Sequence, residues 1–277
     1  MTAPDDVCAV VLAAGLGTRL RPLTTILPKA VVPVGNVPLL ERALHRLSAA
    51  GLNGPHHVAV NAHHMADKVA DLVGDRAHLS HELRPLASAG ALGLLKRWID
   101  HRAVLVLNAD AYVSAPPGDL RDLLDDWDGR TVRMFGRKAD DGHPPFGGLA
   151  FAGASLLPAS DAAALTAEYS HLVLTTWRPA ERAGRLDAIP LDGTYMDCGS
   201  PADYLAANMH AAQGHNLLGA DVVVTGAAYE SVIGADSAVH GVVRRCVLWP
   251  GAHVDADEVL IDSIRVGRDM TVEVTGT

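Results

Sequence analysis

The feature that most constrains this chain is an uncharged apolar run near the N-terminus that leads directly into a loop of small residues. Residues 7–12 are Val-Cys-Ala-Val-Val-Leu, a composition typical of a strand buried on both faces of a sheet. Residues 13–18, Ala-Ala-Gly-Leu-Gly-Thr, have little side-chain bulk, so their N–H groups can close on an anion. Arg19, Arg21 and Lys29 then add positive charge. The combination predicts a polyphosphate site after the first strand.

Two common phosphate-binding loops do not fit this segment. The dinucleotide fingerprint needs a third glycine where Leu20 stands, and no acidic residue ends a second strand about twenty residues further on. The P-loop needs Gly-Lys-Ser/Thr, which is absent here. The remaining alternative is a glycine turn followed by solvated arginines.

The segment resembles the sugar-1-phosphate nucleotidylyltransferase family, which includes mannose-1-phosphate guanylyl-, glucose-1-phosphate thymidylyl- and N-acetylmuramate-1-phosphate uridylyltransferases. The resemblance is carried by Leu12-Ala13-Ala14-Gly15, by Gly17-Thr18-Arg19-Leu20-Arg21-Pro22-Leu23-Thr24 and by Pro28-Lys29. It implies that a nucleoside triphosphate and a sugar 1-phosphate are converted to a nucleotide sugar and pyrophosphate. It also implies catalytic roles for Arg19 and Lys29.

Composition limits the class of protein. The chain has 277 residues and a formal net charge of −9, which disfavours a nucleic-acid binder because such a surface needs positive potential. The N-terminus lacks the basic start of a signal peptide, and no apolar run is long enough to span a membrane. We therefore expect a cytoplasmic enzyme. The 3 cysteines are isolated and form neither a disulfide framework nor a zinc pattern.

Alternating periodicity predicts an α/β fold. Apolar residues at helical spacing predict a helix over 40–47 and another over 65–73, each followed by glycine. Strand patterns occur at 57–60, 79–83 and 103–107. We expect a Rossmann-like, mainly parallel sheet in a catalytic domain covering residues 1–215. A further stripe over 120–127 predicts another helix, with Asp119 and nearby acids on its solvated face.

A second small-residue segment, 85–92, precedes a helix that we expect to continue towards Trp98. The backbone of such a segment can lie against a planar base and offer hydrogen bonds to its edge. It resembles the family's base-contacting loop in Ser88 and Gly90, although Ala87 replaces the usual glycine. The alternative is a plain alanine-rich start of a helix. Together with the first loop, the resemblance implies nucleotide contacts at Leu12, Ala13, Ala14, Gly15, Gly17, Thr18, Ser88, Gly90 and Asn108.

Two aspartates are the predicted metal ligands. Asp110 follows the apolar run 103–107, and an acid at the carboxyl end of a central strand lies where open α/β sheets bind ligands. Asp197 precedes a helix whose start is predicted by Ser200 as N-cap and by Pro201. By resemblance to the family, Asp110 and Asp197 bind Mg2+. The alternative is that Asp110 only begins a turn and that Asp197 has a purely structural role.

The sugar contacts are less clearly marked. The chain lacks the Glu-Lys-Pro and Asn-Ala-Gly segments of many relatives and has Pro-Phe-Gly-Gly-Leu-Ala-Phe-Ala-Gly at 145–153 instead. We expect Gly147, Gly148 and Gly153 to allow backbone approach to the sugar phosphate. His63 and His64 lack acidic or thiolate neighbours at ligand spacing, so they are interpreted as surface residues rather than a metal site.

From Asp221 to Val274 the pattern changes to short aliphatic triplets near a six-residue spacing. This predicts a short left-handed β-helix over residues 216–277, which resembles the tail of mannose-1-phosphate guanylyltransferases. It has too few coils for a hexapeptide acyltransferase, so we expect it to cap the protein or to form a homodimer. A non-catalytic regulatory homologue is the other rival.

Two branches of the family suggest different nucleotide substrates for this chain. The tail favours GTP with mannose 1-phosphate, whereas the Phe-Ala-Gly triplet at 151–153 is closer to the uridylyltransferases. UTP or dTTP with another sugar 1-phosphate is the alternative. No nucleic acid or membrane partner is expected.

Overall fold

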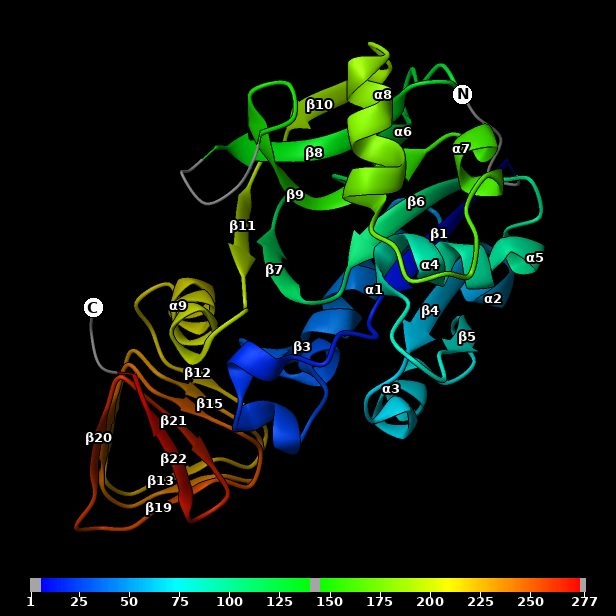
Figure 1. Ribbon diagram of the computed structural model, residues 1–277. Coiled ribbons are helices and arrows are strands. Elements are labelled where there is room, and N and C mark those ends of the chain that lie inside the picture. Colours follow the sequence, from blue (N-terminus) through cyan, green and yellow to red (C-terminus); the bar gives the residue numbers. More distant parts are fainter. Residues whose placement is uncertain (1–5, 140–144, 275–277) are drawn as a thin grey trace. The chain divides into compact units, whose positions relative to one another are not determined.

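The computed structural model of the protein describes residues 6–139 and 145–274 (Figure 1). The chain divides into two compact units. The first contains the described residues up to Leu16, together with Pro28–Val31 and the described part of Leu40–Tyr195. The second contains Gly17–Leu27, Val32–Leu39 and the described residues from Met196 onward. The domain boundary predicted at residue 215 follows the change in sequence periodicity. The two compact units are instead defined by contacts in space, so their boundaries fall elsewhere in the chain.

A seven-stranded sheet is the centre of the first unit. Its strands, in spatial order, are β10 (Leu186–Pro190), β8 (Val132–Lys138), β9 (Leu149–Leu157), β6 (Ala103–Asn108), β1 (Val7–Leu12), β4 (Val58–Ala62) and β5 (His78–His81). β1 lies between β4 and β6 and is parallel to both, while β9 is antiparallel to β6 and β8. The sequence-based expectation of a mainly parallel sheet with residues 7–12 as a central strand is confirmed.

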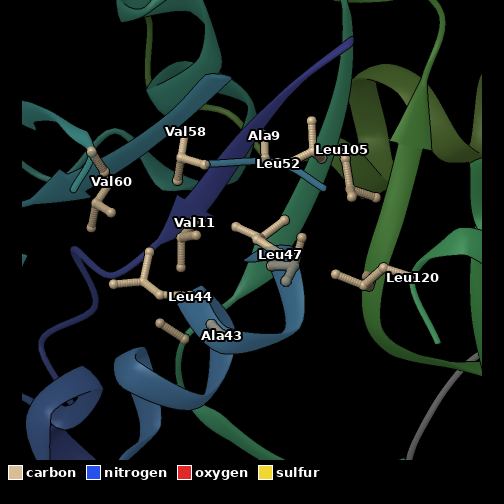
Figure 2. Close-up of a cluster of buried hydrophobic side chains, with 14 of the residues drawn as sticks. Ala9, Val11, Ala43, Leu44, Leu47, Leu52, Val58, Val60, Leu105 and Leu120 are labelled. Atoms are coloured by element: carbon tan, nitrogen blue, oxygen red, sulfur yellow. The ribbon is translucent and has the colours of Figure 1, made fainter. Parts of the chain in front are cut away.

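Helices flank this sheet. Those that belong mainly to the first unit are α1 (Leu39–Ala49), α2 (Gly54–His57), α3 (Ala66–Val73), α4 (Ala87–Leu94), α5 (Lys96–Ile99), α6 (Arg121–Leu124), α7 (Ala159–Ala163) and α8 (Arg178–Arg182). Short helical turns occur at Lys29–Val31 and Val173–Trp177, and short strands at β7 (Ala111–Ser114) and β11 (Thr194–Asp197). Figure 2 shows α1 directing Leu44 and Leu47 towards Val11 of β1. Burial of this apolar face holds α1 on the sheet.

Some sequence-based expectations differ from the structure. The helix expected to reach Trp98 is interrupted, because α4 ends at Leu94 and α5 begins at Lys96. The stripe at 120–127 forms only the four-residue α6. The prediction that Asp119 is solvated is wrong: its side chain is buried and accepts hydrogen bonds from Arg46, at 2.6 Å from Nη2. Asp119 lies just before α6, and an acid at such a place can be buried when an arginine from another helix, here Arg46 of α1, pairs with it.

The second unit contains three successive sets of short parallel strands. These are β12 (Leu217–Leu218), β13 (Val223–Val224) and β14 (Ala227–Tyr229), then β15 (Val232–Ile233), β16 (Ala238–Val239) and β17 (Val242–Arg244), then β18 (Val247–Leu248), β19 (His253–Val254) and β20 (Val259–Ile261), before β21 (Ser263–Val266) and β22 (Met270–Glu273). Leu217 pairs with Val232, and Val232 with Val247, so each of these turns advances by 15 residues (232 − 217 and 247 − 232). Such stacking is consistent with a β-helix. Its left-handedness stays a prediction.

Also in the second unit, α9 (Pro201–Ala212) begins as predicted. The Ser200 side chain accepts a hydrogen bond from the Asp203 N–H, and the Asp203 carboxylate accepts one from the Ser200 N–H, forming a capping box. Tyr204 of α9 is fully buried, donates to the Pro33 carbonyl in the neighbourhood of β2 (Pro33–Val34) and β3 (Val37–Pro38), and accepts from Trp249 Nε1 at 3.0 Å. Burial raises the pKa of this phenol. Short helical turns at Thr18–Leu20 and Leu23–Thr25 complete the unit.

The described part of the chain contains all three cysteines and all the helices named above. Cys8, Cys198 and Cys246 are all buried and free. Burial raises the pKa of Cys8 to about 12, as suits a core thiol in β1. Within residues 6–139 and 145–274, every helix is too short or too polar to cross a bilayer.

Candidate functional site

A pocket of about 370 Å³ opens in the first unit, where β1, β4 and β6 end. The carboxyl ends of parallel strands are the usual ligand position in open α/β sheets, and this volume suits a small ligand. The pocket is lined by Leu12, Ala13, Ala14, Gly15, Leu16, Lys29, Ala30, Asn61, Glu82, Pro85, Ala87, Ser88, Asn108, Asp110, Tyr169 and His171. Residues predicted from the first loop, from the base loop and from the end of β6 therefore share one pocket.

An ion pair lies at the mouth of this pocket. Lys29 is buried, with 6% of its surface exposed, and its Nζ donates to Asp110 Oδ2 at 3.0 Å. The Asp110 side chain is 46% exposed, so its carboxylate faces the open side of the pocket. Lys29 thus supplies positive charge where an anion can reach it, while Asp110 supplies oxygen ligands for a cation.

The first loop is shared between the two units. Its early part lines the pocket, where the Ala13 N–H donates to Asn61 Oδ1 at 2.7 Å and Gly15 faces open space. Gly17 and Thr18 belong to the second unit. Gly17 has φ of 60°, and its carbonyl accepts from Thr24 Oγ1 at 2.8 Å. Glycine suits this left-handed position because it has no Cβ.

The predicted base loop is held from behind by the segment 166–172. The N–H groups of Ala89 and Gly90 donate to the Ser170 carbonyl, at 2.9 and 3.4 Å. Ser88 Oγ accepts from the Leu172 N–H at 3.0 Å. A Cβ on Gly90 would lie 2.3 Å from the Glu168 carbonyl oxygen. Hydrogen bonding and close packing within the protein therefore account for Ser88 and Gly90, and Ala87 adopts a left-handed φ of 58° where the family has glycine.

Tyr169 and His171 form a wall of the pocket that the sequence did not indicate. The Tyr169 hydroxyl lies 3.2 Å from His171 Nε2, and the two rings pack edge to face. Tyr169 is 65% exposed, so most of its ring is accessible at the pocket. No local motif marks either residue, because they reach the pocket only through the pairing of Ser170 with α4.

The predicted sugar glycines have structural reasons that are independent of a ligand. Gly147 and Gly148 have φ of 55° and 86° and form the tip of a tight turn, closed by hydrogen bonds between Phe146 and Leu149. Positive φ at both central residues is the requirement of a type I′ turn. Gly153 has φ of 81°, and a Cβ there would lie 2.9 Å from the Tyr195 ring. These three glycines are absent from the lining of the pocket, and their role in sugar binding stays a prediction.

The other two predicted charged residues meet within the second unit. Arg19 Nη2 lies 3.4 Å from Asp197 Oδ2, with side chains 73% and 39% exposed. A Cβ on Gly199 would approach both groups, at 2.9 Å from Arg19 Nη2 and 2.8 Å from Asp197 Oδ2. Glycine at 199 therefore leaves room for the pair, a role that was not assigned from the sequence.

The donor chemistry suits a hard cation that is also held by its substrates. In the part of the chain that the structure describes, no three His, Cys, Asp or Glu side chains gather into a group that could hold a metal ion. Mg2+ in phosphate-transfer sites is commonly held by one or two carboxylates plus substrate phosphates and water. The half-exposed Asp110 carboxylate beside the pocket fits that coordination.

The known proteins with similar sequences are nucleotidyl transferases. The family model described as nucleotidyl transferase matches residues 8–155. The mannose-1-phosphate guanylyltransferase catalytic subunit beta of Xenopus tropicalis is 35% identical over 117 residues, which are 39% of this chain and 32% of that protein. The Mycobacterium tuberculosis mannose-1-phosphate guanylyltransferase is 33% identical over 129 residues, 44% of this chain and 34% of that protein. These alignments thus span about a third of each relative.

Solved structures agree on the fold. A putative glucose-1-phosphate thymidylyltransferase from Bacillus anthracis superposes with a TM-score of 0.63 at 18% identity, covering 74% of this chain and 95% of that one. HddC from Yersinia pseudotuberculosis gives 0.59 at 20% identity, covering 73% and 98%. At such identities the likeness concerns the fold alone.

Proposed function

Because the chain belongs to the nucleotidyl transferase family, we propose that it converts a nucleoside triphosphate and a sugar 1-phosphate to a nucleotide sugar and pyrophosphate. The observation that carries the proposal is the shared pocket. A small-residue loop, an aromatic wall and the Lys29–Asp110 pair line it together. This arrangement offers separate surfaces for phosphate, base and cation.

In the reaction, an oxygen of the sugar phosphate attacks the α-phosphorus of the triphosphate, and the bond to the β,γ-pyrophosphate breaks. No protein nucleophile is needed, so catalysis consists of positioning and charge neutralisation. Gly15 lets the backbone approach the phosphates, and Lys29 stabilises negative charge near the reacting centre. Arg19, with Gly17 and Thr18 beside it, is assigned to the leaving pyrophosphate on the family resemblance.

Asp110 and Asp197 are the residues that would hold a divalent cation. When bound, such an ion neutralises the charge of the two phosphate groups that must approach each other. Each aspartate forms an ion pair with a basic side chain, Asp110 with Lys29 and Asp197 with Arg19. The buried Lys29 side chain orients the Asp110 carboxylate before a ligand binds, whereas the more exposed Arg19–Asp197 pair fixes its carboxylate less. The choice of Mg2+ follows from the carboxylate ligands and the phosphate substrates.

For the substrates, we favour GTP with mannose 1-phosphate. Support comes from the names of the relatives in Xenopus tropicalis and Mycobacterium tuberculosis. The exposed face of Tyr169 offers a stacking surface for a base, and stacking discriminates weakly between bases. UTP and dTTP are therefore the alternatives to exclude by experiment.

A pyrophosphate-release assay tests the proposal. GTP, UTP, dTTP, ATP and CTP are each mixed with mannose, glucose and N-acetylmuramate 1-phosphates and Mg2+. We expect release only when both substrates are present, and fastest with GTP and mannose 1-phosphate. Faster release with UTP or dTTP would overturn the base assignment alone. Absence of release from every pair would overturn the proposed reaction and favour a regulatory homologue, and acetyl-CoA turnover without pyrophosphate would indicate an acyltransferase.

A further inference from the structure

Two buried polar side chains, Asn61 and Glu82, lie behind the pocket. Only 3% of Asn61 and 1% of Glu82 is exposed, although both contribute to the pocket lining. Asn61 belongs to β4, and Glu82 directly follows the neighbouring strand β5. The Glu82 N–H donates to the Ala62 carbonyl at 2.8 Å, and its own carbonyl lies 2.8 Å from His63 Nδ1. Two contacts with the consecutive residues Ala62 and His63 thus hold the backbone at Glu82.

The two side chains form a continuous line of hydrogen bonds between two loops. The Ala13 N–H donates to Asn61 Oδ1 at 2.7 Å, and Asn61 Nδ2 donates to Glu82 Oε1 at 2.6 Å. The Leu86 N–H donates to Glu82 Oε2 at 3.0 Å. Ala13 begins the small-residue loop, and Leu86 immediately precedes α4 and the predicted base loop. One line of side chains therefore spans from one wall of the pocket to the other.

We propose that Asn61 and Glu82 are positioning residues that set the spacing between the phosphate loop and the base loop, and thereby the affinity for the nucleoside triphosphate. The inference rests on the proposed function for the identity of the ligand. Neither residue needs to touch the reacting atoms. A buried line of satisfied hydrogen bonds admits few alternative arrangements, because each unsatisfied polar atom is costly where water is excluded.

Each hydrogen bond in the line has a fixed donor and a fixed acceptor, so one substitution that exchanges an acceptor for a donor breaks it. In Glu82→Gln, the amide can keep only one of the two acceptor positions that the carboxylate provides. Its NH2 group then faces either Asn61 Nδ2 or the Leu86 N–H, and both are donors. If Asn61 rotates to accept from Gln, its NH2 turns towards the Ala13 N–H instead. Every rotamer of the single variant therefore leaves two donors facing each other.

Exchanging the two functional groups removes this conflict. In the double variant Asn61→Asp/Glu82→Gln, the new carboxylate at 61 accepts from the Ala13 N–H and from the new amide at 82. The amide oxygen at 82 accepts from the Leu86 N–H. All three hydrogen bonds are restored and the net charge is that of the wild type, although the charge has moved between strands. The single Asn61→Asp variant instead brings two carboxyl groups together.

The first measurement is steady-state kinetics of pyrophosphate release. We expect Glu82→Gln and Asn61→Asp each to raise the KM for the nucleotide about tenfold or more, from the cost of one mismatched buried pair. We expect kcat and the KM for the sugar phosphate to change less than about threefold, and the double variant to recover most of the lost affinity. The matched control is Asn53→Asp/Glu273→Gln, the same exchange at two exposed residues.

The second measurement does not depend on turnover. Calorimetric titration of each variant with GTP, UTP and dTTP gives nucleotide affinity directly, and hydrogen exchange reports the Ala13 and Leu86 amides. We expect protection to fall at one or both amides in Glu82→Gln and to return in the double variant. If the wild type binds nucleotide but releases no pyrophosphate, only the proposed reaction fails.

The proposal is overturned if the double variant is no better than Glu82→Gln in nucleotide affinity while both fold. It is also overturned if the single variants lower kcat at unchanged nucleotide KM, since that pattern indicates loss of folded protein. If the wild type binds no nucleotide at all, both the positioning role and the proposed function are excluded. Unchanged protection of the Ala13 and Leu86 amides in Glu82→Gln would exclude the line of hydrogen bonds itself.

Discussion

Among single residues, Asp110 carries two interactions of opposite kind. It neutralises the buried Lys29 at 3.0 Å, and its half-exposed carboxylate offers oxygen to a cation at the pocket. Asn keeps the shape of Asp and loses the charge. The substitution therefore separates the electrostatic role of the carboxylate from its packing.

We expect Asp110→Asn to lower turnover by about a hundredfold or more at fixed Mg2+, the cost of removing one preorganised electrostatic group. Partial recovery at high Mg2+ or with Mn2+ should follow, because weaker cation binding is part of the defect. The matched control is Asp126→Asn, at an exposed left-handed position that asparagine tolerates. Near-normal turnover of folded Asp110→Asn at low Mg2+ would remove the assignment.

Tyr169 tests the aromatic wall of the pocket. Tyr169→Ala should raise the KM for the nucleotide about tenfold, since loss of base stacking costs roughly 1–3 kcal/mol. Tyr169→Phe should stay near wild type, because the ring remains and only the hydroxyl contact with His171 is lost. Tyr229→Ala, which removes an exposed tyrosine of the second unit, is the control. Equal KM values for Tyr169→Ala and Tyr229→Ala would show that Tyr169 does not meet the base.

At the scale of elements, α4 and the segment 166–172 behave as one structure. The Ser170 carbonyl accepts hydrogen bonds at the start of α4, and Gly90 lets the chain at Glu168 approach closely. The same segment carries Tyr169 and His171 into the pocket. Packing behind the helix thus determines the shape of the wall in front of it.

Gly90→Ala should disturb both sides of this arrangement. The added Cβ meets backbone at 2.3 Å, so we expect about 1–3 kcal/mol of lost stability and a raised KM for the nucleotide. The control is Gly129→Ala, where φ of 74° strains alanine but open space surrounds the Cβ. Chemical denaturation and kinetics should show lost stability in both variants and a changed KM only at Gly90. An unchanged KM in Gly90→Ala would separate the segment from nucleotide binding.

Across the whole molecule, features that depend on neighbouring residues in the sequence could be predicted, whereas features that depend on contacts between distant residues could not. The apolar run of β1 and the Ser200–Asp203 cap of α9 were predictable because each depends on neighbours in sequence. Tyr169 was not, since its place depends on a backbone pairing with residues some eighty positions earlier. Glu82 was also missed, because an acid just beyond a short strand has the same local pattern whether it is solvated or buried.

A chain ending after Gly219 tests the role of the β-helix. We expect it to retain measurable turnover, because the Lys29–Asp110 and Arg19–Asp197 pairs lie outside the removed residues. Its melting temperature should fall by about 5 °C or more, as the hydrogen bonds of Trp249 to Tyr204 and of Asn36 to the Ile233 carbonyl are lost. A folded but fully inactive truncation would mean that the tail completes the active site.

The most direct test of the account is the fate of the phosphorus atoms, followed by ³¹P NMR with the wild-type protein, GTP, mannose 1-phosphate and Mg2+. The account predicts that both substrates disappear together and that one pyrophosphate appears for each diphosphate-linked nucleotide sugar. Its phosphorus signals should comprise the α-phosphorus of GTP and the phosphorus of the sugar phosphate. Release of orthophosphate, GDP or GMP without a nucleotide sugar would contradict nucleotidyl transfer.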